Sequence, residues 1–234
     1  MDILIKELEK IKIQIGEKKL AQFKIYMDYL MEYNSHTNLT AIVQPEQILI
    51  KHFFDSLVIT KFLDIKSGDT FIDVGTGAGF PGVPIKIAFK DINLTLMDSS
   101  NKKVAFLKKL IEKLAVEAEI FRARAEELGL QKSFREKFDF AVSRAVAPLN
   151  ILAEYCLSLV KPSGFFVAMK GPSAQEEISN AESAIKILGG KVLKIETFKL
   201  PQNSGTRSIV IIQKTKNTPN IYPRSNSKIS KIPL

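Results

Sequence analysis

The chain has 234 residues, of which 45% are hydrophobic and 25% are charged. This composition fits one globular α/β domain with a modest extension and excludes a largely disordered chain. The formal net charge is +9, and the single cysteine excludes a disulfide framework and a four-cysteine metal cluster. The charged N-terminus lacks the apolar core of a signal peptide, and no stretch reaches the roughly 18 apolar residues that cross a bilayer. We therefore expect a monomeric cytoplasmic protein without a membrane segment or a bound metal.

Residues 1–65 are predicted to be helical. Leu4, Leu8 and Ile11 recur at helical spacing, and a second periodic stretch begins at Phe23. The pattern breaks at residues 34–38, and a third helix is expected to start near Pro45 and to run to about residue 63. These residues form a helical extension ahead of the main domain.

From Thr70 onward, short apolar runs alternate with amphipathic segments. Strands are expected over 70–74, 93–98, 117–121, 138–143 and 164–169, with helices near 82–89, 101–115, 147–160 and 173–188. Strands that alternate with helices across short connections indicate a parallel sheet covered on both faces.

The end of the domain departs from this alternation. Residues 191–200 and 207–214 are both strand-like, and only six residues separate them. Because that gap cannot hold a crossover helix, the two strands should be antiparallel neighbours. We expect a mostly parallel seven-stranded sheet whose last strand is antiparallel, which differs from the six parallel strands of the dinucleotide-binding fold.

A basic tail, residues 217–234, is expected to follow the main domain, residues 66–216. No Asp or Glu occurs after Glu196, whereas seven Lys or Arg residues do. A segment of one charge sign is typical of a surface that binds polyanions, and equally of a tail that only maintains solubility. Three prolines, Pro219, Pro223 and Pro233, predict that the tail is a surface coil.

A glycine-rich loop follows the first predicted strand. Gly75, Gly77 and Gly79 permit a tight turn and a close approach of a ligand to the backbone. Residues 77–82 also satisfy the G-x-G-x-x-G dinucleotide pattern, but its first glycine should directly follow the strand, where Gly75 is. The loop thus predicts a nucleotide-like cofactor without identifying it.

Acidic residues favour S-adenosylmethionine as that cofactor. Asp73 at the mouth of the loop would repel a pyrophosphate but attract an ammonium or a sulfonium, unless it serves only as a turn or helix-cap residue. Asp98 ends the second strand, where a carboxylate can accept the ribose hydroxyls of either cofactor. Ala125 and Glu126 follow the third strand, where adenine would be met, although they could equally be an ordinary helix start.

The end of the fourth strand, residues 143–148, limits the methyl acceptor. It lacks the proline-rich motif used on exocyclic amines, and Cys156 lies on an apolar stretch typical of the core. Lys170 could act as a base toward a ribose hydroxyl, but no second lysine is clearly paired with it. The remaining acceptor is guanine N7, whose free lone pair needs no deprotonation. Arg144 could hold the guanine edge or the cofactor carboxylate, and we predict it to be the catalytic residue.

These motifs together resemble the bacterial 16S rRNA guanine-N7 methyltransferases, the glucose-inhibited division protein B family. The resemblance covers nearly the whole chain and includes NLTAI (38–42), KHFFDSL (51–57), DVGTGAGFPGVPI (73–85), LMDSSNKKVAFL (96–107), RAEEL (124–128), FDFAVSRAVAPL (138–149), MKG (169–171) and YPR (222–224). It implies the class I S-adenosylmethionine-dependent methyltransferase fold and methylation of N7 of one guanine in 16S rRNA of the small ribosomal subunit.

The resemblance also implies which residues of this sequence bind the cofactor and the RNA. It implies cofactor contacts at Gly75, Phe80, Ala125, Glu126 and Arg144. It places four further residues among motif positions that face RNA: Asn38, His52, Lys170 and Arg207. His52 and Asp55 lie three apart on one helix face, which is as consistent with a structural hydrogen bond as with a functional one.

The tail departs from the family pattern, and two other functions remain open. Residues 225–229 replace the small residue, glycine and later proline that usually follow Tyr-Pro-Arg. The first alternative is an NAD-dependent oxidoreductase, suggested by residues 77–82 and Asp98. The second is a non-catalytic RNA-binding or ribosome-assembly factor that retains the fold.

Overall fold

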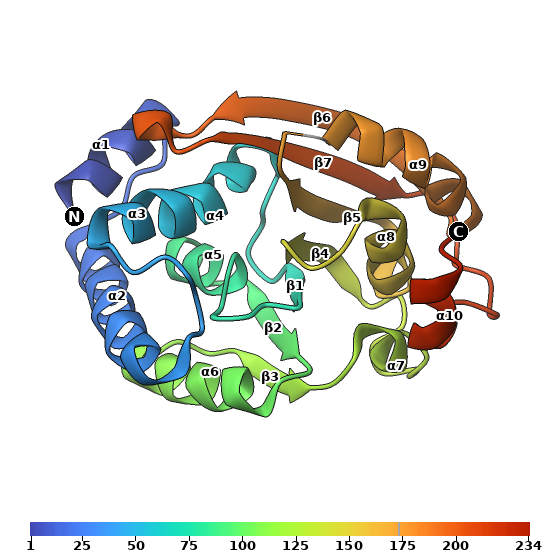
Figure 1. Ribbon diagram of the computed structural model, residues 1–234, viewed down its shortest axis with the longest axis horizontal. Helices are drawn as coiled ribbons and strands as arrows, with labels where there is room; N and C mark the ends of the chain where they lie inside the picture. Colours follow the sequence, from blue (N-terminus) through green and yellow to red (C-terminus); the bar gives the residue numbers. More distant parts are fainter. Residues whose placement is uncertain (173) are drawn as a thin grey trace.

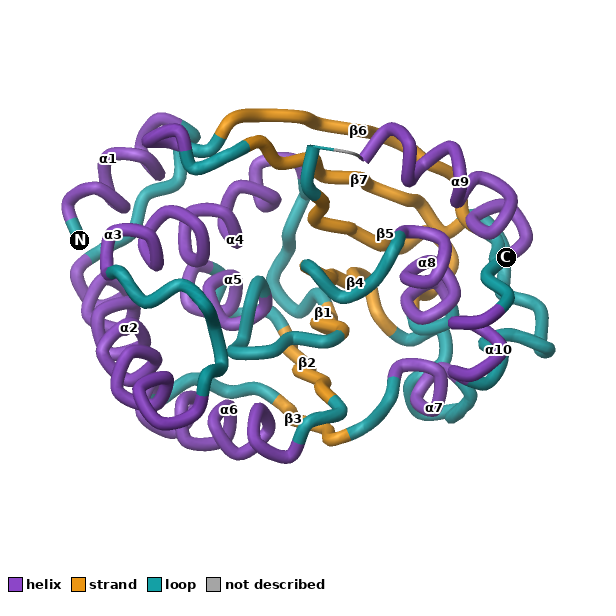
Figure 2. The backbone as a smooth tube through the Cα atoms, in the orientation of Figure 1, coloured by secondary structure: helices purple, strands orange, loops and turns teal. Residues whose placement is uncertain are grey.

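The computed structural model describes residues 1–172 and 174–234, and a seven-stranded sheet runs through its middle (Figure 1, Figure 2). The strand order is β3-β2-β1-β4-β5-β7-β6, and β7 is antiparallel to both of its neighbours. The predicted sheet with one reversed strand is therefore confirmed. The strands are β1 (Thr70–Val74), β2 (Asn93–Asp98), β3 (Glu119–Arg122), β4 (Phe138–Arg144), β5 (Val160–Lys170), β6 (Gly190–Lys199) and β7 (Thr206–Lys214).

Helices cover both faces of the sheet. Before the sheet come α1 (Asp2–Lys10), α2 (Glu17–Thr37), α3 (Pro45–Ile48), a π-helical segment η1 (Leu49–Phe54), α4 (Asp55–Val58) and a 3₁₀ segment η2 (Ile59–Phe62). The others are α5 (Gly82–Ala88), α6 (Asn101–Leu114), α7 (Ala125–Gly129), α8 (Leu149–Leu157), α9 (Ala174–Ile187), the 3₁₀ turn η3 (Pro201–Asn203) and α10 (Asn226–Lys231). The elements from α1 to α6 lie on one side of the sheet, and α7, α8 and α9 lie on the other (Figure 1).

Strand alternation divides the interior into two cores. Along β7, Ile209 and Ile211 belong to the core beneath α1–α6, whereas Val210 and Ile212 belong to the core beneath α7–α9. This follows from the two-residue repeat of a strand, which sends successive side chains to opposite faces. The helical extension thus buries one face of the sheet. Cys156 is fully buried in the second core, as its apolar context predicts.

Several predicted boundaries are wrong by a few residues. Strand β5 begins at Val160, inside the helix expected over 147–160, and β3 spans Glu119–Arg122 instead of 117–121. The break expected at residues 34–38 falls at its far end: α2 continues to Thr37 and stops at Asn38, which takes a left-handed conformation (φ 51°), and α3 begins at Pro45 as expected. Of the helix expected over 173–188, residue 173 lies outside the described residues.

The tail is not the surface coil expected from its prolines. Residues 226–231 form α10, and Ile229 is fully buried. Arg224 donates hydrogen bonds to both carboxylate oxygens of Glu154, which is itself buried in α8. Composition could not reveal this packing, because the partner of Arg224 lies 70 residues earlier in the chain.

No helix of the described residues is both long enough and apolar enough to cross a membrane. Within residues 1–172 and 174–234, no three His, Cys, Asp or Glu side chains are grouped so that they could hold a metal ion.

Candidate active site

Two neighbouring pockets lie at the carboxyl ends of the central strands. The first, here called the strand-end pocket, has a volume of about 450 Å³ and is lined by Gly75, Asp98, Ala125, Glu126, Tyr155 and Asn226, among others. The second, here called the arginine pocket, measures about 380 Å³ and is lined by Lys51, His52, Asp55, Arg144, Lys170 and Arg207, among others. Carboxyl ends of parallel strands are the usual ligand site of open α/β sheets.

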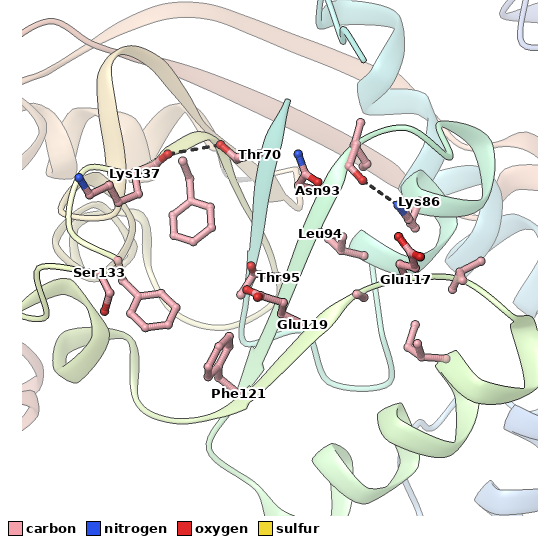
Figure 3. Close-up of a pocket in the computed structure, with 16 residues that line it drawn as sticks. Thr70, Lys86, Asn93, Leu94, Thr95, Glu117, Glu119, Phe121, Ser133 and Lys137 are labelled. Atoms are coloured by element: carbon pink, nitrogen blue, oxygen red, sulfur yellow. Dashed lines mark hydrogen bonds between the residues drawn. The ribbon is translucent and has the colours of Figure 1, made fainter. Parts of the chain in front are cut away.

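A larger cavity, about 850 Å³, lies at the opposite end of the sheet (Figure 3). It is lined by Thr70 and Asn93, which begin β1 and β2, and by the neighbouring Lys137. The Thr70 hydroxyl donates to the Lys137 carbonyl, as the dashed line in Figure 3 shows. Volume alone does not make a site, and this cavity contains none of the predicted site residues. The two pockets at the carboxyl ends are therefore the candidate site.

Gly75 brings the backbone of the glycine loop to the wall of the strand-end pocket. Its φ is +70°, and a Cβ atom at this position would lie 2.6 Å from a methyl carbon of Val146, in the loop after β4. Only glycine fits this conformation and this contact without strain. Gly77 donates its N–H to Asp98, and Gly79 (φ +100°) packs against the Tyr26 hydroxyl. Of the three loop glycines, Gly75 alone lines this pocket within the described part of the chain.

Asp73 holds the glycine loop by hydrogen bonds and does not line either pocket. It is fully buried, and its Oδ2 accepts hydrogen bonds from the Thr76 hydroxyl and the Gly82 N–H, each at 2.7 Å. Burial raises its pKa to about 7. These bonds are those of the alternative role as a turn or cap residue, and a direct contact of Asp73 with a cofactor stays a prediction. Its Oδ1 has no hydrogen-bond partner among the described residues.

Asp98 presents a fixed carboxylate to the strand-end pocket. Oδ2 accepts the Gly77 N–H at 3.0 Å, and Oδ1 accepts the Ser100 N–H at 2.9 Å. Lys103 lies 3.3 Å away as an ion-pair partner. A carboxylate accepts about four hydrogen bonds and these partners occupy three of them, so capacity for one ribose hydroxyl remains while Lys103 is bound, and for two once Lys103 is displaced.

Ala125 and Glu126, at the start of α7, line the same wall. Glu126 is almost completely buried, and burial raises its pKa. The structure thus brings Gly75, Asp98, Ala125 and Glu126 together around one cavity, although they come from three separate segments.

Arg144 is held in the arginine pocket by partners from the helical extension. Its Nη1 donates to the Lys51 carbonyl at 3.1 Å and to Asp55 at 3.3 Å, and its Nη2 contacts Nδ1 of His52 at 3.1 Å. Its guanidinium lies over the ring of Phe80, 5.0 Å from the centroid. Phe80 does not line the strand-end pocket, where a cofactor contact was expected, but serves as a platform for Arg144.

His52 is neutral in this arrangement. Its ring stacks on Phe80 at 4.4 Å, and burial together with the nearby Arg144 lowers its pKa to about 3. Because a guanidinium only donates, Nδ1 must accept, and the ring proton resides on Nε2, which lies 3.0 Å from the Thr40 hydroxyl.

Asp55 is a functional candidate that the sequence did not reveal. Its Oδ2 accepts from Arg144 and also from Arg207 Nε at 3.2 Å, and its side chain is 2% exposed. Burial raises its pKa, whereas both arginines act to lower it. The spacing of His52 and Asp55 suggested a bond between them; instead, they share Arg144. That i, i+3 spacing was the one available signal.

The other predicted RNA-facing residues differ in position. Lys170 lines the arginine pocket, but its Nζ donates to the Ala147 carbonyl at 2.7 Å and pairs with Glu177 at 2.6 Å. Arg207 lines the pocket as well. Asn38 is exposed at the end of α2 and lines neither pocket.

The strand order, the reversed β7 and the glycine loop at the tip of β1 define the class I methyltransferase fold. The chain is similar to a class I S-adenosylmethionine-dependent methyltransferase from Listeria monocytogenes, with a TM-score of 0.60, 13% identity and coverage of 83% of this chain and 69% of that one. A further match is an S-adenosylmethionine-dependent methyltransferase from Aquifex aeolicus, with a TM-score of 0.54, 20% identity and coverage of 74% and 94%.

Sequence comparison identifies the family within that class. Residues 19–209 match the family described as rRNA small subunit methyltransferase G, and the chain belongs to this family. It is 45% identical to the ribosomal RNA small subunit methyltransferase G of Alkaliphilus metalliredigens, over 97% of this chain and 95% of the relative. The Bacillus subtilis relative of the same name is 44% identical, over 95% and 93%. The resemblance seen in the motifs is thereby confirmed.

Proposed function

We propose that this protein transfers the methyl group of S-adenosylmethionine to N7 of a guanine in 16S rRNA of the small ribosomal subunit, acting as a cytoplasmic monomer. The observation that carries the proposal is that the two pockets adjoin at Ala145, which lines both. A donor in the strand-end pocket would therefore lie next to a base in the arginine pocket.

The residues of the strand-end pocket fit S-adenosylmethionine. Its volume of about 450 Å³ lies within the range of small-molecule sites. Asp98 would accept the ribose hydroxyls, Ala125 and Glu126 would border the adenine, and the Gly75 backbone would border the amino-acid end. When bound, the cofactor supplies a methyl group activated by a positively charged sulfur. Asp73 is buried beneath the same loop with Oδ1 unpartnered in the described structure, and because burial raises its pKa to about 7, a positively charged cofactor beside it would favour its ionised form.

The arginine pocket fits an RNA base. Four cationic side chains line it, Lys51, Arg144, Lys170 and Arg207, against the single carboxylate of Asp55. Cationic side chains neutralise RNA phosphates and supply most of the affinity that does not depend on sequence.

The titratable groups of the arginine pocket favour an acceptor that needs no deprotonation. His52 is a poor base because its pKa is about 3, and its Nδ1 accepts from Arg144. The carboxylate oxygen Oδ2 of Asp55 already accepts hydrogen bonds from two arginines. Guanine N7 presents a free lone pair, so the residues need only align it with the methyl carbon.

Arg144 is the residue best placed to align the guanine. Three hydrogen bonds to its neighbours occupy three of its five N–H donors, which leaves at most two for a ligand. Since N7 must stay free to attack, these donors would bind guanine O6 or the carboxylate of the cofactor. The bonds from Lys51, His52 and Asp55 fix the orientation of the guanidinium before substrate binds.

The test is methyl transfer to small ribosomal subunits prepared from a strain that lacks this protein. Labelled S-adenosylmethionine should yield N7-methylguanosine in 16S rRNA, identified by nucleoside mass spectrometry and by chain cleavage specific for N7-methylguanine. Arg144→Lys keeps the charge but loses the planar fork, and we expect kcat/KM to fall about 100-fold. Lys132→Ala, at an exposed position, is the matched control.

Each result of this assay has a distinct meaning. A raised KM for RNA with unchanged cofactor affinity in Arg144→Lys would place its donors on the guanine, whereas weakened cofactor binding would place them on the cofactor carboxylate. Tight RNA binding without methyl transfer, with subunits or with free rRNA, would refute the proposal in favour of a non-catalytic assembly factor. Membership of a methyltransferase family argues against the dinucleotide alternative.

A further inference from the structure

The C-terminal tail reaches the strand-end pocket. Asn226 and Ser230, both on α10, line its wall together with Ile151 and Tyr155 of α8. Helix α10 packs against α8, as Figure 1 shows at the C-terminal end of the chain. These residues lie beyond the sheet ends and glycine loop that form the rest of the wall, so the pocket is incomplete without the tail.

The tail is firmly attached to the body of the protein. Arg224 bonds Glu154 through its backbone N–H at 2.7 Å and through its guanidinium, with Nη2 also at 2.7 Å. Arg135 donates to the carbonyls of Tyr222 and Thr218, at 2.8 and 2.6 Å. With Ile229 buried as well, α10 is held in place against the pocket before any ligand binds. The Tyr-Pro-Arg motif thus anchors the tail.

The side-chain amide of Asn226 lines the strand-end pocket with one of its two ends bonded. The Tyr155 hydroxyl donates to Asn226 Oδ1 at 2.6 Å, which leaves Nδ2 as the free end of the amide. Nδ2 donates to no group in the described residues, although Asn226 is half-buried in the pocket wall. Tyr155 also lies close to Glu126: burial and, secondarily, the Glu126 charge raise the Tyr155 pKa. Asn226 and Tyr155 line the strand-end pocket together with Ala125 and Glu126.

We propose that α10 closes the nucleoside end of the cofactor pocket and that Asn226 Nδ2 donates a hydrogen bond to a ring nitrogen of the adenine. Adenine offers unprotonated ring nitrogens as acceptors, and Asn is well suited to its edge. Tyr155 is a positioning residue that fixes the amide. This inference rests on S-adenosylmethionine being the cofactor. Asn226 lies in the segment that departs from the family pattern, so the contact belongs to this chain's own tail.

The test is calorimetric titration of the full-length protein, without RNA, with S-adenosylhomocysteine and with methylthioadenosine, which keeps the nucleoside but lacks the amino-acid end. Loss of one hydrogen bond should weaken the binding of both ligands about threefold to tenfold in Asn226→Ala. Tyr155→Phe should weaken both by a smaller factor. Lys231→Ala, exposed on the same helix, should bind like the unaltered protein.

The ligand pair separates the possible failures. Unchanged affinity in Asn226→Ala, or a loss for S-adenosylhomocysteine alone, would overturn the adenine contact and leave the methyltransferase proposal standing. If the unaltered protein bound neither S-adenosylhomocysteine nor S-adenosylmethionine, both proposals would fall. Thermal unfolding of each variant checks that it is folded. Arg224→Ala releases the tail but changes no residue of the pocket wall, and it should weaken the binding of both ligands as well.

Discussion

Asp55→Asn should damage the arginine pocket and leave the strand-end pocket intact. The substitution removes the one negative charge that pairs with Arg144 at 3.3 Å and with Arg207 at 3.2 Å. The Asp55 side chain is 2% exposed and that of Arg144 14% exposed, so water can replace the carboxylate only poorly. Breaking a buried ion pair on one side costs about 3 kcal/mol of unfolding free energy. For a domain of this size, that corresponds to a fall in Tm of roughly 6–12 °C.

The same change should lower catalysis more than cofactor binding. Once freed from Asp55, Arg144 would lose its fixed orientation, and misplacement of about 1 Å typically costs 100-fold in rate. Asp55 does not line the strand-end pocket, so with the free donors of Arg144 on guanine O6, S-adenosylhomocysteine should bind within about twofold of the unaltered affinity. With those donors on the cofactor carboxylate, its binding should weaken as well. The assays are methyl transfer to small subunits, calorimetric titration and thermal unfolding.

Asp28→Asn is the matched control for this prediction. Asp28 also pairs with a cation, Lys24 at 2.9 Å, but its side chain is 56% exposed, so the change should cost less than about 0.5 kcal/mol. Combining Asp55→Asn with Arg144→Gln should cost less than the sum of the two single changes, because both remove the same pair. An Asp55→Asn protein with unaltered Tm and transfer rate would refute the reasoning.

Three further predictions concern the glycine loop, the buried histidine and the RNA surface. Gly75→Val should abolish the binding of S-adenosylhomocysteine, because the new Cβ would lie 2.6 Å from Val146 at a φ of +70°. Calorimetric titration measures this binding, and an unaltered affinity would refute the role of the loop. The His52 pKa is lowered to about 3 from 6.5, so the unfolded chain takes up a proton that the folded one does not. The stability that comes from keeping His52 neutral is fully present above pH 6.5. As the pH falls from 6.5 toward 3, the free energy of unfolding should decrease by about 1.4 kcal/mol per pH unit. Denaturant titrations should show a shallower decrease of the free energy of unfolding in His52→Gln. Lys51 and Arg207 are the arginine-pocket cations left for phosphates, because Arg144 is assigned to the guanine or the cofactor and Lys170 pairs with Glu177 at 2.6 Å. If both meet phosphates, log affinity for single-stranded RNA against log salt should have a slope of about −1.4, and Lys51→Gln should reduce it by about 0.7. A flat response measured by filter binding would exclude these contacts.

Local signals in the sequence determined the architecture. Apolar runs separated by amphipathic helices predicted the parallel strands, and the six-residue gap before residues 207–214 predicted the reversal of β7, because chain geometry allows no crossover in so short a gap. The glycine spacing after β1 likewise indicated a tight loop at a ligand site. Gly75, Asp98, Ala125 and Glu126 lie around one pocket because ends of adjacent parallel strands meet at one edge of the sheet.

Only the tertiary structure decided which side chains contact one another across the chain. Asp55 meets Arg144 over 89 residues and Arg207 over 152, and these contacts exist because the helical extension packs on the face that carries the ends of β4 and β7. Asp73 is buried beneath the loop, and Phe80 supports Arg144 instead of lining the strand-end pocket. Periodicity reports which face of an element is apolar, but burial and hydrogen-bond partners depend on how distant elements dock, and no local pattern encodes that.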